Sequence, residues 1–193
     1  MLIDEYINQL KAQIAADGNE IAYRKLYELF YIPLMRMAFS VYPSKEAAEE
    51  IVSDVFIKIW LNRKSLHKIE KFKSYLFKAT YNKALNYLRN HKKYQYELLS
   101  DYTLDFLSPA PNPEQIMMNS ELEKRIHAAI QSLPPKCRQI FLLVKENNLK
   151  YKEVGRILNI SVNTIDNQMA IALKKIAESI SFKLKQTKHR NFF

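Results

Sequence analysis

The chain has 193 residues and a formal net charge of +10, and 48% of its residues are hydrophobic. This composition supports a buried core and argues against global disorder. Its two glycines and single cysteine disfavour a Gly-rich phosphate loop, a turn-rich all-β fold and an internal disulfide. No stretch approaches the roughly 18 apolar residues of a membrane-spanning helix, and no signal-peptide pattern opens the chain. We therefore expect a cytoplasmic, mostly helical protein with no membrane insertion.

Net charge is distributed unevenly along the chain. Residues 58–93 carry 11 basic side chains and one acidic side chain, whereas residues 94–122 carry five acidic and no basic side chains. Residues 123–180 are again basic, with ten Lys or Arg and five Asp or Glu. Two basic blocks thus flank an acidic segment. The first block favours a polyanionic partner, because such a density of like charge repels itself unless it is neutralised.

A domain boundary is predicted inside the acidic segment. Pro109, Pro111 and Pro113 fall within five positions, where they prevent a helix. We interpret 94–122 as a linker between a domain over 1–93 and a domain over 123–180. A surface loop within one domain remains the alternative. The basic tail, 181–193, is either a frayed end or a source of additional non-specific DNA affinity.

Helical spacing predicts the elements of the first domain. Helices are expected over 3–15 and 20–40, with Gly18 between them. Ser44 is predicted to cap a third helix, in which apolar residues recur at the spacing of an amphipathic helix as far as Trp60. The pattern breaks over 62–69, and a fourth helix is expected over 71–93.

The second domain ends in a predicted helix-turn-helix. Helices are expected over 122–133 and 136–147, separated by Pro134 and Pro135, and a short helix over 151–158 follows. Asn159 suits a left-handed turn, and Ser161 can cap the final helix. Two short helices joined by a tight turn are typical of DNA-binding helix-turn-helix proteins.

The final helix carries polar side chains that suit double-stranded DNA. Amide side chains can bond adenine edges in the major groove, and lysines neutralise phosphates. A solvated face on a helical hairpin remains the alternative. The candidate residues are Ser161, Asn163, Thr164, Asn167, Gln168, Lys174 and Lys175.

The basic block at 58–93 indicates a different kind of nucleic-acid contact. Its cations alternate with aromatic residues, a combination that suits single-stranded or opened DNA because bases stack on aromatic rings. Some of these aromatic side chains, including Phe77 and Tyr81, are expected in the core. A solvated lysine-rich face is the competing interpretation.

Several runs resemble extracytoplasmic-function (ECF) sigma factors of the sigma-70 family. Glu49–Trp60 resembles their core-binding helix, and Phe72–Phe77 with Asn86–Arg89 resembles their promoter-melting, −10-reading helix. Three later runs are similar to their −35-reading domain: Leu133–Lys136, Tyr151–Val154 and Ile160–Ile165. The resemblance covers roughly residues 20–180.

This resemblance implies an all-α fold with two small helical domains, a sigma-2-like bundle and a sigma-4-like helix-turn-helix, joined by the acidic linker. It implies that core RNA polymerase binds through its β′ clamp helices near Ile51, Asp54, Val55 and Lys58. The loop 62–71 would hold a flipped −10 base. The opened strand would lie along Lys71, Lys73, Tyr75, Lys78, Asn82, Asn86 and Arg89.

The resemblance also implies partners for the second domain. Its early helices would engage the β flap, and its last helix the −35 element. An anti-sigma factor, possibly membrane-bound, is expected as a further partner, and no cofactor or metal is expected. Gly155 and Asn159 stand where the family usually has Ala and Gly. Gly155 is expected to weaken its helix by about 1 kcal/mol relative to Ala.

Three other classes of function compete with a sigma factor. A stand-alone helix-turn-helix regulator would explain the second domain equally well but leaves the basic-aromatic block unexplained. A membrane-surface protein is compatible with lysine-rich amphipathic helices. An enzyme is disfavoured, because the four histidines are scattered with no metal-ligand or catalytic spacing and Cys137 suits a core position.

Overall fold

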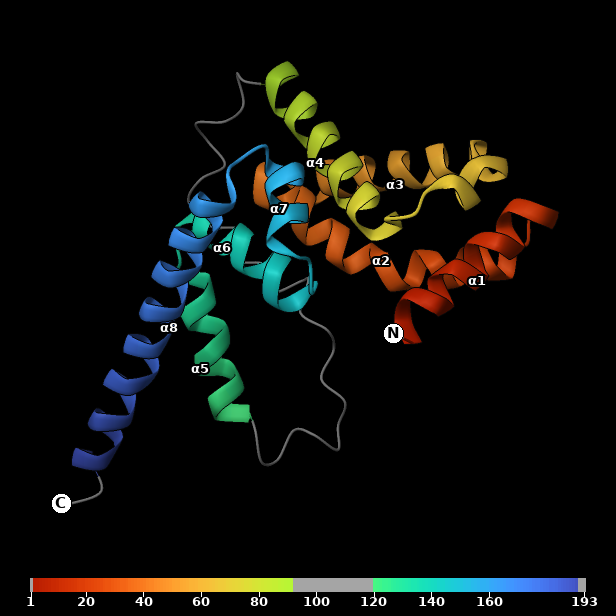
Figure 1. Cartoon of the computed structure of the whole chain (residues 1–193). Helices are drawn as coiled ribbons and strands as arrows, with labels where there is room; N and C mark the ends of the chain where they lie inside the picture. Colours follow the sequence, from red (N-terminus) through yellow and green to blue (C-terminus); the bar gives the residue numbers. More distant parts are fainter. Residues whose placement is uncertain (1, 92–119, 191–193) are drawn as a thin grey trace. The chain divides into compact units, whose positions relative to one another are not determined.

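The computed structural model of this chain describes residues 2–91 and 120–190, and every regular element in these stretches is a helix (Figure 1). This confirms the all-α prediction. The chain divides into two compact units, unit 1 with residues 1–108 and unit 2 with residues 109–193. The acidic linker predicted at 94–122 lies outside the described residues up to 119, and residues 120–122 already belong to a helix.

The described part of unit 1 has five helical elements. They are α1 (Leu2–Asp17), α2 (Glu20–Val41), α3 (Lys45–Leu61), the 3-10 helix η1 (Arg63–Lys68) and α4 (Phe72–Asn90). The ends differ from the predicted ranges by three residues at most. Part of the segment expected to be a loop at 62–71 is therefore a short helix.

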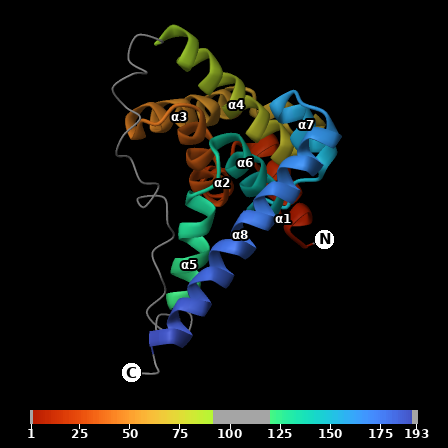
Figure 2. The same ribbon diagram turned by 90° about the vertical axis from the view of Figure 1, so that its left-hand side faces the viewer.

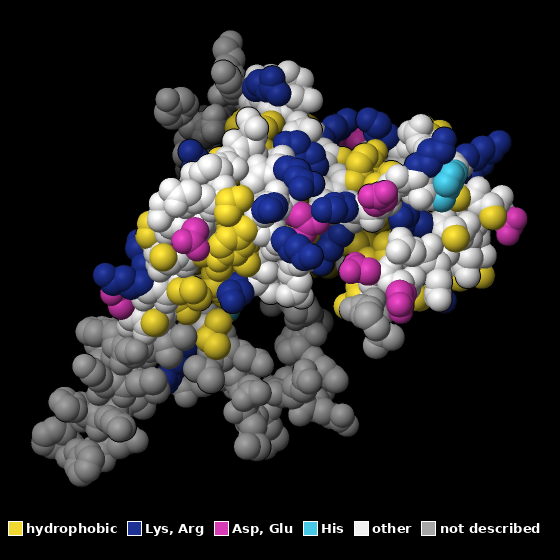
Figure 3. Space-filling model, in the orientation of Figure 1, with side chains coloured by type: hydrophobic (Ala, Val, Ile, Leu, Met, Phe, Trp, Pro, Cys, Tyr) yellow, Lys and Arg dark blue, Asp and Glu magenta, His cyan; other side chains and the backbone are white. Residues whose placement is uncertain are grey.

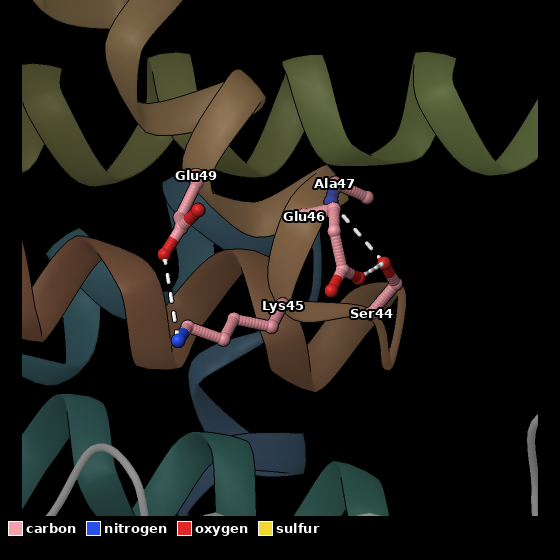
Figure 4. A network of polar contacts seen from close by, with 5 residues as sticks. All are labelled: Ser44, Lys45, Glu46, Ala47 and Glu49. Atoms are coloured by element: carbon pink, nitrogen blue, oxygen red, sulfur yellow. Dashed lines mark hydrogen bonds and ion pairs between the residues drawn. The ribbon is translucent and has the colours of Figure 1, made fainter.

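Local side-chain signals separate the helices of unit 1. Gly18 has φ of 64°, a conformation that glycine adopts without strain, between α1 and α2. Asn19 then caps α2. Ser44 caps α3 as predicted, since the Ala47 N–H donates to Ser44 Oγ at 3.2 Å (Figure 4). The Ser44 hydroxyl donates in turn to the Glu46 carboxylate at 2.9 Å (Figure 4). The caps satisfy donors that a helix start leaves without internal partners.

Large aromatic and aliphatic side chains fill the core of unit 1. Phe56 of α3 and Phe77 of α4 are 2% and 0% exposed. Phe72, at the start of α4, packs edge-on against Phe30 of α2, with ring centroids 6.2 Å apart. α1 packs on η1 and α2 through three buried side chains, Ile7, Leu10 and Ile14.

The described part of unit 2 also has five helical elements. They are α5 (Ser120–Gln131), α6 (Pro135–Phe141), the π-helical turn η5 (Leu142–Glu146), α7 (Tyr151–Leu158) and α8 (Val162–Arg190). The helix predicted over 136–147 is thus divided between α6 and η5. α5 runs beside α8 in both views (Figures 1 and 2), and α6 and α7 also pack on α8. α8 continues to Arg190, so residues 181–190 of the predicted basic tail belong to this helix.

Small and medium-sized side chains form the centre of unit 2. Leu133, Cys137 and Ala172 make one buried cluster, against which Phe141 and Ile176 pack. Cys137 is 1% exposed, as its predicted core role requires. The Cys137 thiol of α6 donates to the Gln168 carbonyl of α8 at 3.3 Å, so the two helices lie close together here.

The turn between α7 and α8 has the geometry of the predicted helix-turn-helix. Asn159 is left-handed, with φ of 56° and ψ of 48°, and the Ile160 N–H donates to the Gly155 carbonyl at 3.0 Å. A Cβ atom on Gly155 would lie only 2.9 Å from the Ile160 carbonyl oxygen. The expected weakening by Gly155 considered helix propensity alone and missed this close approach.

Candidate nucleic-acid interface

One side of α4 carries a row of cationic, aromatic and amide side chains, which we call the α4 stripe. Because an α-helix has about 3.6 residues per turn, residues three or four positions apart share one side. All members of the row are exposed or half-buried, whereas Phe77 and Ala84 face the core. The α4 stripe consists of Lys71, Tyr75, Lys78, Asn82, Asn86 and Arg89.

Lys73 does not lie on the α4 stripe. It follows Lys71 by two residues, which corresponds to roughly 200° of rotation about the helix. Its side chain is half-buried, whereas Lys71 is exposed. The structure therefore brings six of the seven residues predicted for the opened strand together and leaves Lys73 on another side of the helix.

The two ends of the α4 stripe differ in the hydrogen bonds that their side chains make. At the start, Lys71 occupies the N-cap position without a side-chain cap, and the first turn contains no acidic residue. Helix starts carry partial positive charge, so this end attracts anions. At the other end, the Arg89 guanidinium donates to Asn86 Oδ1 at 2.6 Å, which orients both side chains on the surface.

The segment leading into the stripe is also basic. η1 exposes Lys64 and Lys68, and Leu66 anchors it in the core with 1% exposure. The Arg63 guanidinium lies 4.8 Å from the centre of the Trp60 ring and donates to the Trp60 carbonyl at 3.1 Å. Figure 3 shows Lys and Arg side chains gathered beside an exposed histidine at this end of unit 1.

The first turns of α8 present the second candidate surface. Asn163, Asn167 and Lys174 form one row on the side away from the core, and Thr164, Gln168 and Lys175 form the adjacent row. The core side is marked by Ile165, Met169 and Ala172, all at most 2% exposed. We call these two rows the α8 face.

Ser161 has a structural role beside the α8 face. The Thr164 N–H donates to Ser161 Oγ at 3.0 Å, which is the predicted cap, and the two hydroxyls lie 2.8 Å apart. The Ser161 hydroxyl therefore stabilises the start of α8. Lys174, further along, lies 4.0 Å from the Glu178 carboxylate in an exposed pair that contributes little to stability.

The outer side of α3 is a third surface, which we call the α3 outer face. Its C-terminal half exposes two large apolar side chains, Ile57 at 55% and Leu61 at 71%. Its N-terminal half is acidic and polar. The α3 outer face consists of Glu46, Glu50, Ser53, Ile57 and Leu61.

Comparison with known families identifies the family of the chain. The model of sigma-70 region 2 matches residues 26–94, and the model of sigma-70 region 4 matches residues 123–176. Together the two matched stretches cover more than half of the chain. The chain belongs to the sigma-70 family. The α4 stripe falls within region 2 of this sigma factor, and the α8 face falls within region 4.

The similar curated proteins are RNA polymerase sigma factors, and several of them are named as ECF sigma factors. SigW of Bacillus subtilis is 25% identical over 177 residues, covering 88% of this chain and 91% of SigW. The sigma-E factor of Escherichia coli is 22% identical over 184 residues, covering 92% of this chain and 96% of that protein. SigE of Mycolicibacterium smegmatis is 27% identical over 134 residues, which are 69% of this chain and about half, 52%, of that relative.

Two solved structures share the fold of this sigma factor. One is CnrH in complex with the cytosolic domain of CnrY, with a TM-score of 0.53, 20% identity and coverage of 91% of this chain and 97% of that one. The other is RpoE in complex with the anti-sigma factor NepR from Bartonella quintana. Its TM-score is 0.58 at 19% identity, with coverage of 82% and 96%.

The structure places the four α3 residues that were predicted to bind polymerase at different depths. Ile51 and Val55 are 0% and 5% exposed and pack in the core of unit 1. Asp54 is half-exposed and pairs with Lys83 of α4 at 2.5 Å. Lys58 is exposed. Ile57 and Leu61, which were not among the predicted residues, are exposed opposite the apolar side of α3.

One further residue of the α8 surface is a candidate for contact with DNA. Asp166, exposed among the first turns of α8, was not predicted, although a carboxylate there can accept a hydrogen bond from a cytosine amino group.

The described residues contain no cluster of three potential metal-ligating side chains. Within the same residues, no helix is long and apolar enough to cross a membrane.

Burial raises the pKa values of two tyrosines beside the stripe, Tyr81 and Tyr87. Tyr81 is half-buried and not in the core as expected, and burial raises its pKa. The pKa of Tyr87 is also raised, first by burial and then by the Glu50 carboxylate. Tyr87 stacks on His91 with ring centroids 4.2 Å apart. Both tyrosines thus remain neutral hydrogen-bonding and packing groups at ordinary pH.

Proposed function

We propose that this sigma factor directs promoter recognition through three surfaces with separate roles. The α4 stripe and η1 hold the opened −10 strand, the α8 face holds the −35 duplex, and the α3 outer face holds core RNA polymerase. The protein acts in the cytoplasm by binding alone and performs no chemistry itself. The alignment of six cationic, aromatic and amide side chains on one side of α4 is the observation that carries this proposal.

The α4 stripe combines the two features that single-stranded nucleic acid requires. Its cations can follow the phosphates, and Tyr75, 38% exposed, offers a ring on which a base can stack. The Asn82 and Asn86 amides can bond the Watson–Crick edges of bases, which are exposed only when the strands are separated. Residues 62–71 place additional cations at the end of α4 where the helix start attracts phosphate.

The α8 face suits duplex DNA instead. A helix of this kind places its N-terminal residues against base edges in the major groove. Asn163 and Asn167 can pair with adenine edges, and Lys174 and Lys175 can neutralise phosphates further along. Contacts to the duplex would position polymerase before the strands open.

The α3 outer face supplies an apolar anchor for a protein partner. Ile57 and Leu61 lie one turn apart and are exposed in unit 1. Exposed apolar groups of this size, with polar neighbours, are typical of protein-binding surfaces. We assign them to the β′ clamp helices of polymerase, and the early helices of unit 2 to the β flap. Asp54 and Lys58 would then border the contact.

An anti-sigma factor is the further partner that we propose. Both similar structures are complexes, one with the cytosolic domain of CnrY and one with the anti-sigma factor NepR. A protein that binds the same surfaces as polymerase or DNA would hold this sigma factor inactive. A stand-alone helix-turn-helix regulator is not favoured, because it leaves the region 2 match without a role.

Reconstitution with core polymerase tests the three roles separately. Tyr75→Ala should leave core binding and −35 binding unchanged and weaken binding of the opened strand about tenfold, because base stacking contributes about 1–3 kcal/mol per base. Tyr6→Ala is its matched control, since Tyr6 of α1 is 39% exposed. Equal effects of the two substitutions would contradict the role of the α4 stripe.

The proposed role of the α3 outer face can also be tested against a matched control substitution. Leu61→Glu should weaken binding of core polymerase by tenfold or more, since a charge would enter an apolar contact. Ile21→Glu places the same charge on α2 at a side chain that is 69% exposed, close to the 71% of Leu61. Titration of labelled sigma factor with core polymerase measures both affinities, and indistinguishable values would overturn this assignment.

A further inference from the structure

α1 makes an unusual buried contact with the segment that precedes α4. Lys11 is 3% exposed, although lysine is among the residues least often buried. Its ammonium donates to the Ile69 carbonyl at 2.6 Å and to Asn8 Oδ1 at 3.0 Å. Burial lowers the pKa of Lys11. The two acceptors replace water that burial removes, so this lysine is held in a defined position.

The Ile69 carbonyl that Lys11 binds lies at the junction between η1 and α4, where no side chain caps the start of α4. Ile69 is the C-cap residue of η1. Lys71 is the N-cap residue of α4, and its side chain makes no capping hydrogen bond. Two lysines near the start of α4 add charge of the unfavourable sign at that helix terminus. The link from Lys11 spans 58 positions in sequence and fixes this junction from another helix.

The same contact reaches the α4 stripe. Lys11 Nζ lies 5.6 Å from the centre of the Phe72 ring, within the range of a cation–π interaction. Phe72 is 3% exposed and stacks on Tyr75, with ring centroids 6.4 Å apart and an interplanar angle of 25°. A continuous set of contacts therefore leads from α1 to the exposed ring of the stripe.

We propose that Lys11 is a positioning residue, through which α1 orders residues 62–71 and Tyr75 for the opened strand. This inference rests on the proposed strand-binding role of the α4 stripe and extends it to a helix outside the region 2 match, which begins at residue 26. An ordered segment binds more tightly because less freedom is lost on binding.

The test compares Lys11→Met with Lys25→Met in the holoenzyme. Both substitutions remove one positive charge, but Lys25 is exposed on α2. Lys11→Met should weaken binding of a single-stranded −10 oligonucleotide about tenfold, the scale of a lost hydrogen bond to a charged group. Affinity for core polymerase and for a −35 duplex should stay unchanged, which a general loss of folding would not allow. Lys25→Met should change none of the three.

Hydrogen exchange locates the effect. The Ile69 and Tyr75 N–H groups donate to Leu66 and Lys71 carbonyls, and their exchange should accelerate in Lys11→Met while the centre of α3 stays protected. Asn8→Ala, an exposed substitution that removes one of the two acceptors, should act in the same direction by about twofold. It keeps the test decisive if Lys11→Met does not fold.

The outcomes separate this inference from the proposed function. If the wild-type holoenzyme binds the strand and both Lys11→Met and Asn8→Ala match Lys25→Met, Lys11 has no positioning role and the α4 stripe stands. If the wild-type holoenzyme does not bind the strand and Tyr75→Ala has no effect, the role of the stripe fails, and this inference fails with it. Weaker strand binding with localised faster exchange supports the positioning role.

Discussion

Units 1 and 2 build their DNA surfaces in different ways. In unit 1 the α4 stripe lies along the length of a helix whose opposite side packs into a core of large rings, such as Phe56 and Phe77. In unit 2 the α8 face begins at a turn that depends on Gly155 and Asn159. Side-chain packing therefore controls the first surface, and backbone geometry controls the second.

The largest expected effect comes from the core of unit 1. Phe77→Ala should destabilise unit 1 by about 3–5 kcal/mol, because it removes a fully buried ring and leaves a cavity. Calorimetry should show an early transition of unit 1 and an unchanged transition of unit 2. Tyr75→Ala, on the exposed side of the same helix, is the control. A parallel shift of both transitions would show that the two units are not independent in stability.

The second largest expected effect concerns the turn between α7 and α8 in unit 2. Gly155→Ala should destabilise unit 2 by about 1–3 kcal/mol, because its Cβ would crowd the Ile160 carbonyl in a well-packed region. Helix propensity alone predicts the opposite sign, a gain of about 1 kcal/mol. Urea unfolding followed by circular dichroism distinguishes the two. Asn159→Gly serves as the control, since glycine suits a left-handed position and should be neutral or slightly stabilising.

A pH titration contrasts the two units without mutation. Burial is the first cause of raised pKa values for five tyrosines of unit 1: Tyr23, Tyr27, Tyr31, Tyr81 and Tyr87. The unfolded chain therefore releases these protons first, so the stability that they contribute is complete below pH 10 and is lost as pH rises through the folded values. In the described part of unit 2, burial raises the pKa of the Cys137 thiol. Denaturant midpoints above pH 10 should fall further for unit 1, and an equal fall would contradict this contrast.

The smallest effect concerns a single hydroxyl in the core of unit 1. Thr80 is 0% exposed, and its Oγ1 has no hydrogen-bond partner. Thr80→Val keeps the shape and removes the cost of burying that group, so it should stabilise unit 1 by about 1 kcal/mol. Thermal unfolding should show a higher midpoint for unit 1 with unit 2 unchanged. A lower midpoint would mean that the hydroxyl makes a favourable contact.

Patterns of local origin were predictable from the sequence. Ser44 and Ser161 were identified as caps because the signal lies within three residues, and the left-handed turn at Asn159 follows from the same kind of local chemistry. The residues of the α4 stripe were expected from the resemblance, and helical periodicity separates Lys73 from the other six. These features need no knowledge of tertiary packing.

Features that depend on distant packing were not predictable. The resemblance predicted that α3 binds polymerase and named Ile51 and Val55, whose burial in the core of unit 1 it did not show. The exposed pair, Ile57 and Leu61, follows only once the buried side of α3 is known. The contact of Lys11 with the Ile69 carbonyl joins residues 58 positions apart, and no local pattern indicates it.

Site-specific photo-cross-linking tests the central claim most directly. A cross-linking amino acid at position 82 of the α4 stripe should react with one strand of the −10 region, and only after the holoenzyme has opened the promoter. The same group at position 167 of the α8 face should react with the −35 duplex before and after opening. Cross-links from position 82 to closed duplex DNA, or none to the opened strand, would contradict the division of roles between the two units.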